Sequence, residues 1–138
     1  MTLGGNNKRI KELRTENDWL SKNEESVDAY NKDPFCTFIF TAGAYKDFFT
    51  ILVDLAKKKD FDRMNRELPV FLVSGEEDPV GNYGKGVEAC YKQFKELGFS
   101  DVSMKLYPGD RHEILNELDR SLVFDDIKEW LDKAIEKA

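Results

Sequence analysis

The stretch that decides the fold is LPVFLVSG, residues 68–75, a short apolar run rich in Val and Leu. Pro69 stands near its start and Gly75 ends it. A run of this length, with apolar residues at both odd and even positions, is typical of a strand buried on both faces of a parallel sheet. We therefore predict a buried parallel strand here.

The residues that follow alternate between helix and strand patterns. A helix is predicted over residues 84–97, because apolar residues recur on one face and Gly98 provides a stop signal. The stretch VSMKLYP (102–108) alternates, which predicts a strand near a sheet edge with one wetter face. Its inward side chains are expected to be Val102, Met104 and Leu106, and its outward ones Ser103, Lys105 and Tyr107. A last helix is predicted over residues 121–136.

This order of elements predicts the fold class. Strand, helix, strand and helix in succession imply a right-handed parallel crossover. Two parallel strands alone make a poor sheet, and the strand at 68–75 is expected to be buried on both faces. The chain is therefore predicted to be α/β and to form the end of a larger sheet.

The first half of the chain is less regular. Residues Ile10–Tyr30 follow a patchy helical pattern, with a thin apolar stripe on a charged surface. Pro34 breaks that pattern, since the residue before a proline avoids the helical region. FCTFIF (35–40) fits either a short strand or a buried lining segment, because periodicity does not decide between them. A helix is predicted over residues 44–58 from the spacing of Phe48, Leu52 and Leu55.

Composition limits the partners. The chain has 138 residues and 41% hydrophobic residues, which fits one domain with a modest core. A net charge of −6 argues against nucleic acid and anionic membranes, because phosphates would be repelled. No segment approaches about 18 uninterrupted apolar residues and no signal-peptide pattern opens the chain, so no stable membrane insertion is expected. Cys36 and Cys90 match no metal or redox spacing, which favours reduced thiols in a soluble, cytoplasmic protein.

Polar loops follow both predicted strands. Asp78 lies four residues past Ser74, and His112, the only histidine, lies a similar distance past Tyr107. The carboxyl ends of neighbouring parallel strands lie side by side, so these loops are expected to meet. A carboxylate beside a neutral imidazole orients the ring, fixes its tautomer and stabilises the imidazolium. Asp before Pro is also a common turn initiator, and a lone His is often a solvated surface residue; together at adjacent strand ends they favour a catalytic site.

Two other motifs are incomplete. HEILN (112–116) begins like the zinc motif HExxH, but Asn116 stands where a second His is required, so no metal is expected. In GNYGKG (81–86), Lys85 is followed by Gly rather than by Ser or Thr, so turn glycines explain it better than a phosphate cradle. The Phe-rich stretch Phe35–Phe49 fits packing or the lining of an apolar pocket better than a cofactor box. No cofactor is expected.

The sequence shows no nucleophile for an imidazole to activate. None of the six serines lies in a G-x-S-x-G elbow, and neither cysteine lies in the equivalent G-x-C-x-G. Ser74 ends a strand, but it precedes the Asp loop on that same strand. The third member of a triad is therefore expected outside this chain.

Two stretches resemble the C-terminal part of bacterial α/β-hydrolases of the monoacylglycerol lipase/lysophospholipase-like group. They are LPVFLVSGEEDPVGNYGKGV (68–87) and VSMKLYPGDRHEILNELDRSLVFDDIKEWL (102–131). RTENDWLSKNEESVDAYNKDPFC (14–36) is similar to the mobile cap that covers the acyl-binding cleft in that family. The resemblance implies a helical cap segment at residues 1–43, followed at 44–138 by the C-terminal part of an α/β-hydrolase fold with parallel strands and crossover helices.

The resemblance also implies residue roles. In that family the triad follows the chain order Ser, Asp, His. Asp78 matches the acid of the G-x-x-D-P-V-G loop, and His112 matches the base of Y-x-x-x-R-H-E-x-L-N-E. The early strands, the oxyanion-hole loop and the G-x-S-x-G serine of the family lie upstream of where this chain begins. A truncated protein, a split gene and an internal start are all compatible with that departure.

The implied function is a serine hydrolase that cleaves carboxylic esters, of the monoacylglycerol or lysophospholipid type or another small ester. The side chains expected to receive the acyl chain are Trp19, Phe35, Phe38, Phe40 and Val80. The alternative is a non-catalytic fragment, or a hydrolase-like binding module, stabilised by pairing with another chain. The exposed edge of the strand at 68–74 would then take a strand from an N-terminal half or from a second copy.

Overall fold

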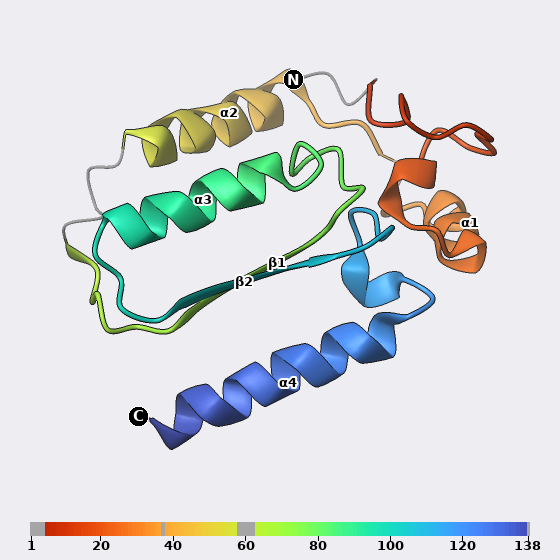
Figure 1. The fold of residues 1–138 in the computed structure, drawn as a ribbon. Coiled ribbons are helices and arrows are strands. Elements are labelled where there is room, and N and C mark those ends of the chain that lie inside the picture. The colour runs from red at the N-terminus through yellow and green to blue at the C-terminus, as the bar shows by residue number, and fades with distance from the viewer. Residues whose placement is uncertain (1–4, 37, 58–62, 138) are drawn as a thin grey trace.

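The computed structural model describes residues 5–36, 38–57 and 63–137. Its helices and strands are α1 (Glu24–Lys32), α2 (Ala42–Ala56), β1 (Val70–Gly75), α3 (Lys85–Glu96), β2 (Val102–Tyr107) and α4 (Arg120–Glu136), with short 3-10 helices at Asp18–Leu20 and Ile114–Asn116. The strands form a sheet that lies between α3 and α4, and the N-terminal segment lies beyond one end of it (Figure 1).

The two strands pair in parallel, as the sequence predicts. Val70 lies opposite Val102, and the register continues to Gly75 opposite Tyr107. In the described part of the chain β1 has β2 as its one neighbour. The expectation that β1 is buried on both faces is wrong for most of its length: Val70–Val73 are half-buried, and burial is complete at Ser74 and Gly75. The reason is the open second edge of β1, where no described strand covers it.

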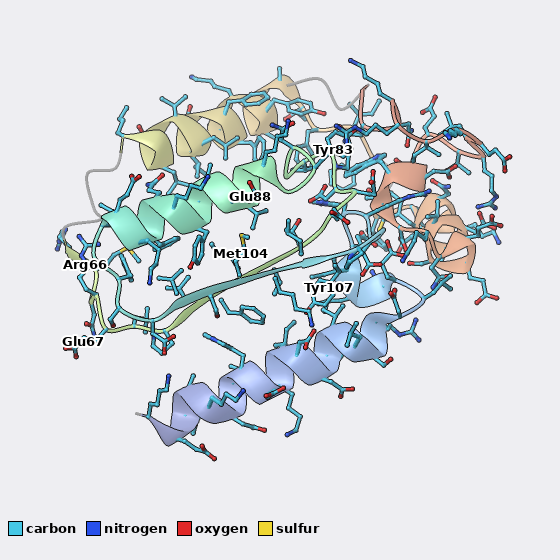
Figure 2. All side chains as sticks on the ribbon, viewed as in Figure 1. Arg66, Glu67, Tyr83, Glu88, Met104 and Tyr107 are labelled. Atoms are coloured by element: carbon cyan, nitrogen blue, oxygen red, sulfur yellow. The ribbon has the colours of Figure 1, made fainter. Side chains whose placement is uncertain are left out.

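Each helix that flanks the sheet covers one face of it. Phe71 of β1 stacks on Trp130 of α4, with 5.6 Å between ring centroids. The same face contributes Val73 to a core with Tyr107 and Val123. The opposite face of β2 meets α3, and Figure 2 shows Met104 on that side and Tyr107 on the side of α4.

The expectation that Tyr107 points outward is therefore wrong. Its side chain is only 2% exposed, and its hydroxyl donates a hydrogen bond of 3.0 Å to Asp126. Lys105, on the same face, pairs with Asp126 at 2.5 Å and is half-buried. The alternation predicted the strand correctly, but the face with polar side chains is covered by α4 instead of by water.

Helix α3 follows the predicted range closely. Its apolar face packs against the sheet, and Phe94 meets Phe99 edge-to-face at 5.0 Å just beyond the helix end. Gly84 precedes the helix with φ of 81°, and Gly98 follows it with φ of 84°. Both glycines adopt the left-handed conformation that other residues reach only with strain, so they define the helix boundaries.

The N-terminal segment is not the single helix that the pattern over Ile10–Tyr30 predicts. Turns and a 3-10 helix occupy its first part, and α1 begins at Glu24. Buried Asp18 accepts hydrogen bonds from the backbone N–H groups of Arg14 and Thr15 and from the Thr15 hydroxyl. These bonds satisfy backbone donors locally, which offers the chain an alternative to a helix.

The described residues of the segment 35–40 form no strand, and none of them is fully buried. Phe38, Ile39 and Phe40 lie in irregular structure, and each is more than 40% exposed; Thr37 lies outside the described residues. Helix α2 confirms the predicted helix with bounds two residues earlier. Its described side chains are exposed except for half-buried Phe49. This part of the chain thus presents a long apolar surface.

One structural observation bears on the prediction that the chain does not insert stably into a membrane. Within the described residues, no helix combines the length and the hydropathy that crossing a bilayer would require.

Candidate active site

The first loop of the site begins where β1 ends. The Asp78 N–H donates to the Gly75 carbonyl at 3.3 Å, which closes a turn directly after the strand. The side-chain carboxylate of Asp78 accepts the Val80 N–H at 2.8 Å, and the backbone carbonyl of Asp78 accepts the Tyr83 N–H at 2.8 Å. Asn82 and Tyr83 have positive φ angles of 52° and 56°. Left-handed non-glycine residues cost free energy, so the surrounding bonds must hold this loop in place.

The second loop begins where β2 ends and lies against the first. The Glu76 N–H donates to the Tyr107 carbonyl at 2.9 Å, and the Glu77 N–H donates to the Asp110 carbonyl at 2.8 Å. A Cβ atom on Gly75 would overlap the backbone at Asp110. The glycine therefore allows a close approach of the two loops that any side chain would prevent.

This approach brings the two predicted catalytic residues together. The Nδ1 atom of His112 lies 3.1 Å from both carboxylate oxygens of Asp78. Asp78 is buried, whereas the His112 side chain is 37% exposed. An Nδ1–H that donates to the carboxylate leaves Nε2 unprotonated and able to accept a proton. In the described part of the chain, no hydrogen bond joins Nε2 to another residue.

The two groups change each other's proton affinity. The hydrogen bond to Asp78 raises the pKa of His112 above its ordinary value, although burial of the ring opposes this shift. Burial raises the pKa of Asp78, but the hydrogen bonds from His112 and from the Val80 N–H outweigh it and leave that pKa lowered. Both shifts favour the imidazolium–carboxylate state that a general base passes through after it takes a proton.

The N-terminal segment contributes the next contact. The Trp19 ring lies 5.0 Å from the imidazole, tilted by 39°. The Trp19 carbonyl accepts the His112 N–H at 3.4 Å, and the Leu20 carbonyl accepts the Glu113 N–H at 2.8 Å. A segment about 90 positions earlier in the sequence therefore fixes the backbone on either side of the histidine.

An apolar cavity of about 540 Å³ opens beside the imidazole. His112 lines it together with all five side chains that the sequence assigned to the acyl site: Trp19, Phe35, Phe38, Phe40 and Val80. Tyr45, Phe48 and Phe49 belong to the aromatic stretch that the sequence singled out as a possible pocket lining. Asn6 and Tyr30 also line the cavity and were missed, because one lies in a polar stretch and the other ends a weak helical stripe.

Among the described residues, no hydrogen bond joins the imidazole of His112 to a serine or a cysteine. Ser74 is buried, and its hydroxyl donates to the Gly75 carbonyl at 3.2 Å. Ser21 is buried as well, and its hydroxyl donates to Glu117 at 2.9 Å. Cys36 lies in the cavity, but burial raises the pKa of its thiol, which disfavours the thiolate. Among the described residues, no cluster of His, Cys, Asp and Glu could hold a metal ion.

Comparison with known proteins identifies the family of this chain. Residues 4–119 match the family described as serine aminopeptidase, S33. The chain belongs to the serine aminopeptidase S33 family. The matched residues include both loops of the site.

Two curated proteins are similar to this S33 family chain. Monoglyceride lipase of Saccharomyces cerevisiae is 39% identical over 71 residues, which cover 49% of this chain and 21% of the yeast protein. Monoacylglycerol lipase of Mycolicibacterium smegmatis is 27% identical over 117 residues, which cover 83% of this chain and 38% of that protein. The chain therefore spans less than half the length of either relative.

Solved structures show that the S33 family chain has part of an α/β-hydrolase fold. A thermostable carboxyl esterase from Bacillus coagulans, in complex with glycerol, matches 96% of this chain with a TM-score of 0.81 and 30% identity, over 44% of the esterase. A lipase in an open form matches 94% with a TM-score of 0.75 and 26% identity, over 42% of the lipase. A soluble variant of the yeast monoglyceride lipase with a substrate analogue matches 81% with a TM-score of 0.59 and 26% identity, over 40% of its length.

Proposed function

We propose that this chain supplies the acid, the base and the acyl cavity of a carboxylic ester hydrolase. One observation carries the proposal: the imidazole of His112, which is hydrogen-bonded to Asp78, lines an apolar cavity. The nucleophile in this proposal is a serine outside the residues of this chain, because none of its own six serines lies in a G-x-S-x-G elbow.

The catalytic steps assign one role to each group. The Nε2 atom of His112 takes the serine proton as the hydroxyl attacks the ester carbonyl, and it later gives that proton to the leaving alcohol. Asp78 accepts the Nδ1–H throughout, so the ring keeps one tautomer and the transient imidazolium is stabilised. In the second half of the reaction, Nε2 takes a proton from the water that attacks the acyl-serine. It then returns this proton to the serine oxygen as the acid leaves. Because the base must start neutral, activity is expected to rise with pH through the raised pKa of His112.

The cavity favours esters with an apolar acyl chain. Aromatic rings dominate its lining, and the imidazole of His112 forms part of that lining. Its volume of about 540 Å³ suits a fatty acyl group. Monoacylglycerols, which the names of two relatives specify, and lysophospholipids both present one such chain on a polar head.

A single-chain chimera tests the proposal. This chain would replace the matching 44% of the Bacillus coagulans carboxyl esterase, and hydrolysis of p-nitrophenyl esters would be followed. We expect ester hydrolysis that His112→Ala lowers on the order of 10⁴-fold. The matched control is Lys128→Ala, on the exposed face of α4, which should leave the rate unchanged. A folded chimera whose activity survives His112→Ala would overturn the assignment.

A second candidate function is pairing with another chain, in which this polypeptide is not catalytic by itself, and the open edge of β1 favours it. A groove of about 530 Å³ runs between this edge and α3, lined by Phe71, Leu72, Val73, Val80, Gly81, Gly86, Val87 and Cys90. Unpaired strand edges beside apolar surface invite an added strand. The solved relatives match nearly all of this chain over less than half of their own length, so we propose that the occupant is the remaining part of an α/β-hydrolase domain.

The exposed thiol of Cys90 lets the groove be monitored. Alkylation of Cys90 by maleimide should slow when the complementary part of the Bacillus coagulans esterase is added, and light scattering should report a one-to-one complex. Lys133→Cys, on the exposed outer face of α4, gives a control thiol whose rate should not change. A homodimer of this chain with protected Cys90 would make a second copy the occupant instead. Unchanged alkylation in all mixtures would count against a docking role for the groove.

A further inference from the structure

Glu117 is a fully buried carboxylate with three donors. Its exposed fraction is 0%. One oxygen accepts the backbone N–H of Arg111 at 2.8 Å. The other accepts the Ser21 hydroxyl and the backbone N–H of Lys22, each at 2.9 Å. Three hydrogen bonds of this kind offset much of the cost of burying a carboxylate.

The three donors come from two segments that are distant in sequence. Arg111 directly precedes His112 in the loop after β2, whereas Ser21 and Lys22 follow Trp19 in the N-terminal segment. The carboxylate therefore joins the backbone of the histidine loop to the segment that carries the ring packed against the imidazole. Each of its two oxygens serves one of the two segments.

Neighbouring contacts tie the same segments together. The guanidinium of Arg111 donates to the carbonyls of Asp18 at 2.6 Å and Ser21 at 3.0 Å. The Lys22 ammonium pairs with buried Asp110 at 2.5 Å. These contacts hold the segments close, but only Glu117 contacts the backbone of both through its own side chain among the hydrogen bonds of the described residues.

We propose that Glu117 is a positioning residue, which holds His112 and Trp19 in register so that the imidazole faces Asp78 on one side and the acyl cavity on the other. The proposal rests on the function proposed above for the Asp78–His112 pair. Glu117 does not touch the reacting atoms, and it acts through the backbone of Arg111 and through Ser21. The N-terminal segment is thus part of the catalytic geometry as well as a cover for the cavity.

The substitution Glu117→Gln tests this directly. An amide can accept hydrogen bonds only at its oxygen, so either the Arg111 N–H or the pair of donors on Ser21 and Lys22 loses its acceptor. The chain has one histidine, so its imidazole gives a single set of NMR signals. We expect the cross-relaxation between the rings of Trp19 and His112 to be lost and the pKa of His112 to fall, while cooperative unfolding is retained.

Glu113→Gln is the matched control, because it makes the same change from carboxylate to amide at the residue next to His112. Glu113 raises the pKa of His112 through its charge, and among the described residues its side chain bonds only the exposed amide of Asn116. The control should lower the pKa of His112 without loss of the contact between the rings. If Glu117→Gln lowers that pKa no more than the control does and keeps the ring contact, the positioning role is wrong.

Ser21→Ala covers the case in which Glu117→Gln does not fold. It removes one donor from the carboxylate and leaves the charge in place. A weakened contact between the rings would support the role of Glu117, and an unchanged contact would overturn it. These measurements need no catalysis, so they can fail while the esterase chimera succeeds, or succeed while the chimera is inactive.

Discussion

Gly75, the last residue of β1, lies directly against the carbonyl oxygen of Arg111, and a Cβ atom on the glycine would overlap that oxygen. The strand that leads to the acid thus sets how closely the loop of the base can approach it. The Nδ1 distance of 3.1 Å from His112 to Asp78 depends on this absence of a side chain.

Gly75→Ala is expected to separate the catalytic pair. The overlap with backbone atoms cannot be relieved by rotation of a side chain, so the loop must move, at a cost of about 1–3 kcal/mol in the free energy of unfolding. Urea unfolding and the NMR titration of the imidazole measure both effects. Gly43→Ala is the control, because its Cβ would have only an ordinary contact in exposed helix α2. Equal behaviour of the two variants would contradict the role given to Gly75.

The imidazole of His112 should titrate above its ordinary value of about 6.5. Since its folded pKa is raised, its contribution to stability is complete below the unfolded pKa and is lost as pH rises through the folded pKa. The lowered pKa of Asp78 gives a contribution that is lost as pH falls through it. Asp78→Asn should therefore reduce the melting temperature most between these two pKa values, and it should lower the pKa of His112. An unchanged titration curve in the variant would show that the pair does not form in solution.

Lys22→Met should destabilise the protein in a pH-dependent way. Burial raises the pKa of Asp110 although Lys22 opposes this, and the second oxygen of the carboxylate has no hydrogen-bond partner among the residues that the structure describes. Without the ammonium that pKa rises further, so the folded state holds a proton that the unfolded state has released, and stability falls as pH rises. We expect a loss of about 1–3 kcal/mol at pH 7 and a smaller loss near pH 4.

Denaturant unfolding at both pH values checks this expectation. Lys128→Met is the control, because that lysine pairs with Asp132 on an exposed helix surface, where an ion pair adds little. A pH-independent loss in Lys22→Met would point to packing of the lysine stem as the cause, and not to the buried charge.

The two cysteines should react at different rates with maleimide. Cys90 is exposed, whereas Cys36 is half-buried and its thiol has a raised pKa. In a Cys90→Ser variant, a medium-chain monoacylglycerol should slow the alkylation of Cys36, because that thiol lines the apolar cavity. Glycerol alone is the control and should give no protection. If both compounds have the same effect, the cavity does not receive the acyl chain.

The sequence predicted those residues of the site that lie in a loop directly after a strand. Asp78 and His112 each follow a strand that its own residues specify, and parallel pairing then brings the loops together. Glu117 could not be found in this way, because nothing in the residues around a glutamate indicates which distant donors its carboxylate will meet. Only the return of Ser21 and Lys22 to this position gives it three donors and removes it from water.

The sequence by itself determined the strands, the helices after residue 42 and the two polar loops at the strand ends, because hydrophobic periodicity and glycine stops act over a few neighbouring residues. The tertiary structure decided which faces are covered and which contacts hold the site. Tyr107 is buried because α4 covers it, and Trp19 reaches His112 because hydrogen bonds join segments about 90 positions apart. Such contacts depend on where the chain returns in space, and no local pattern encodes that position.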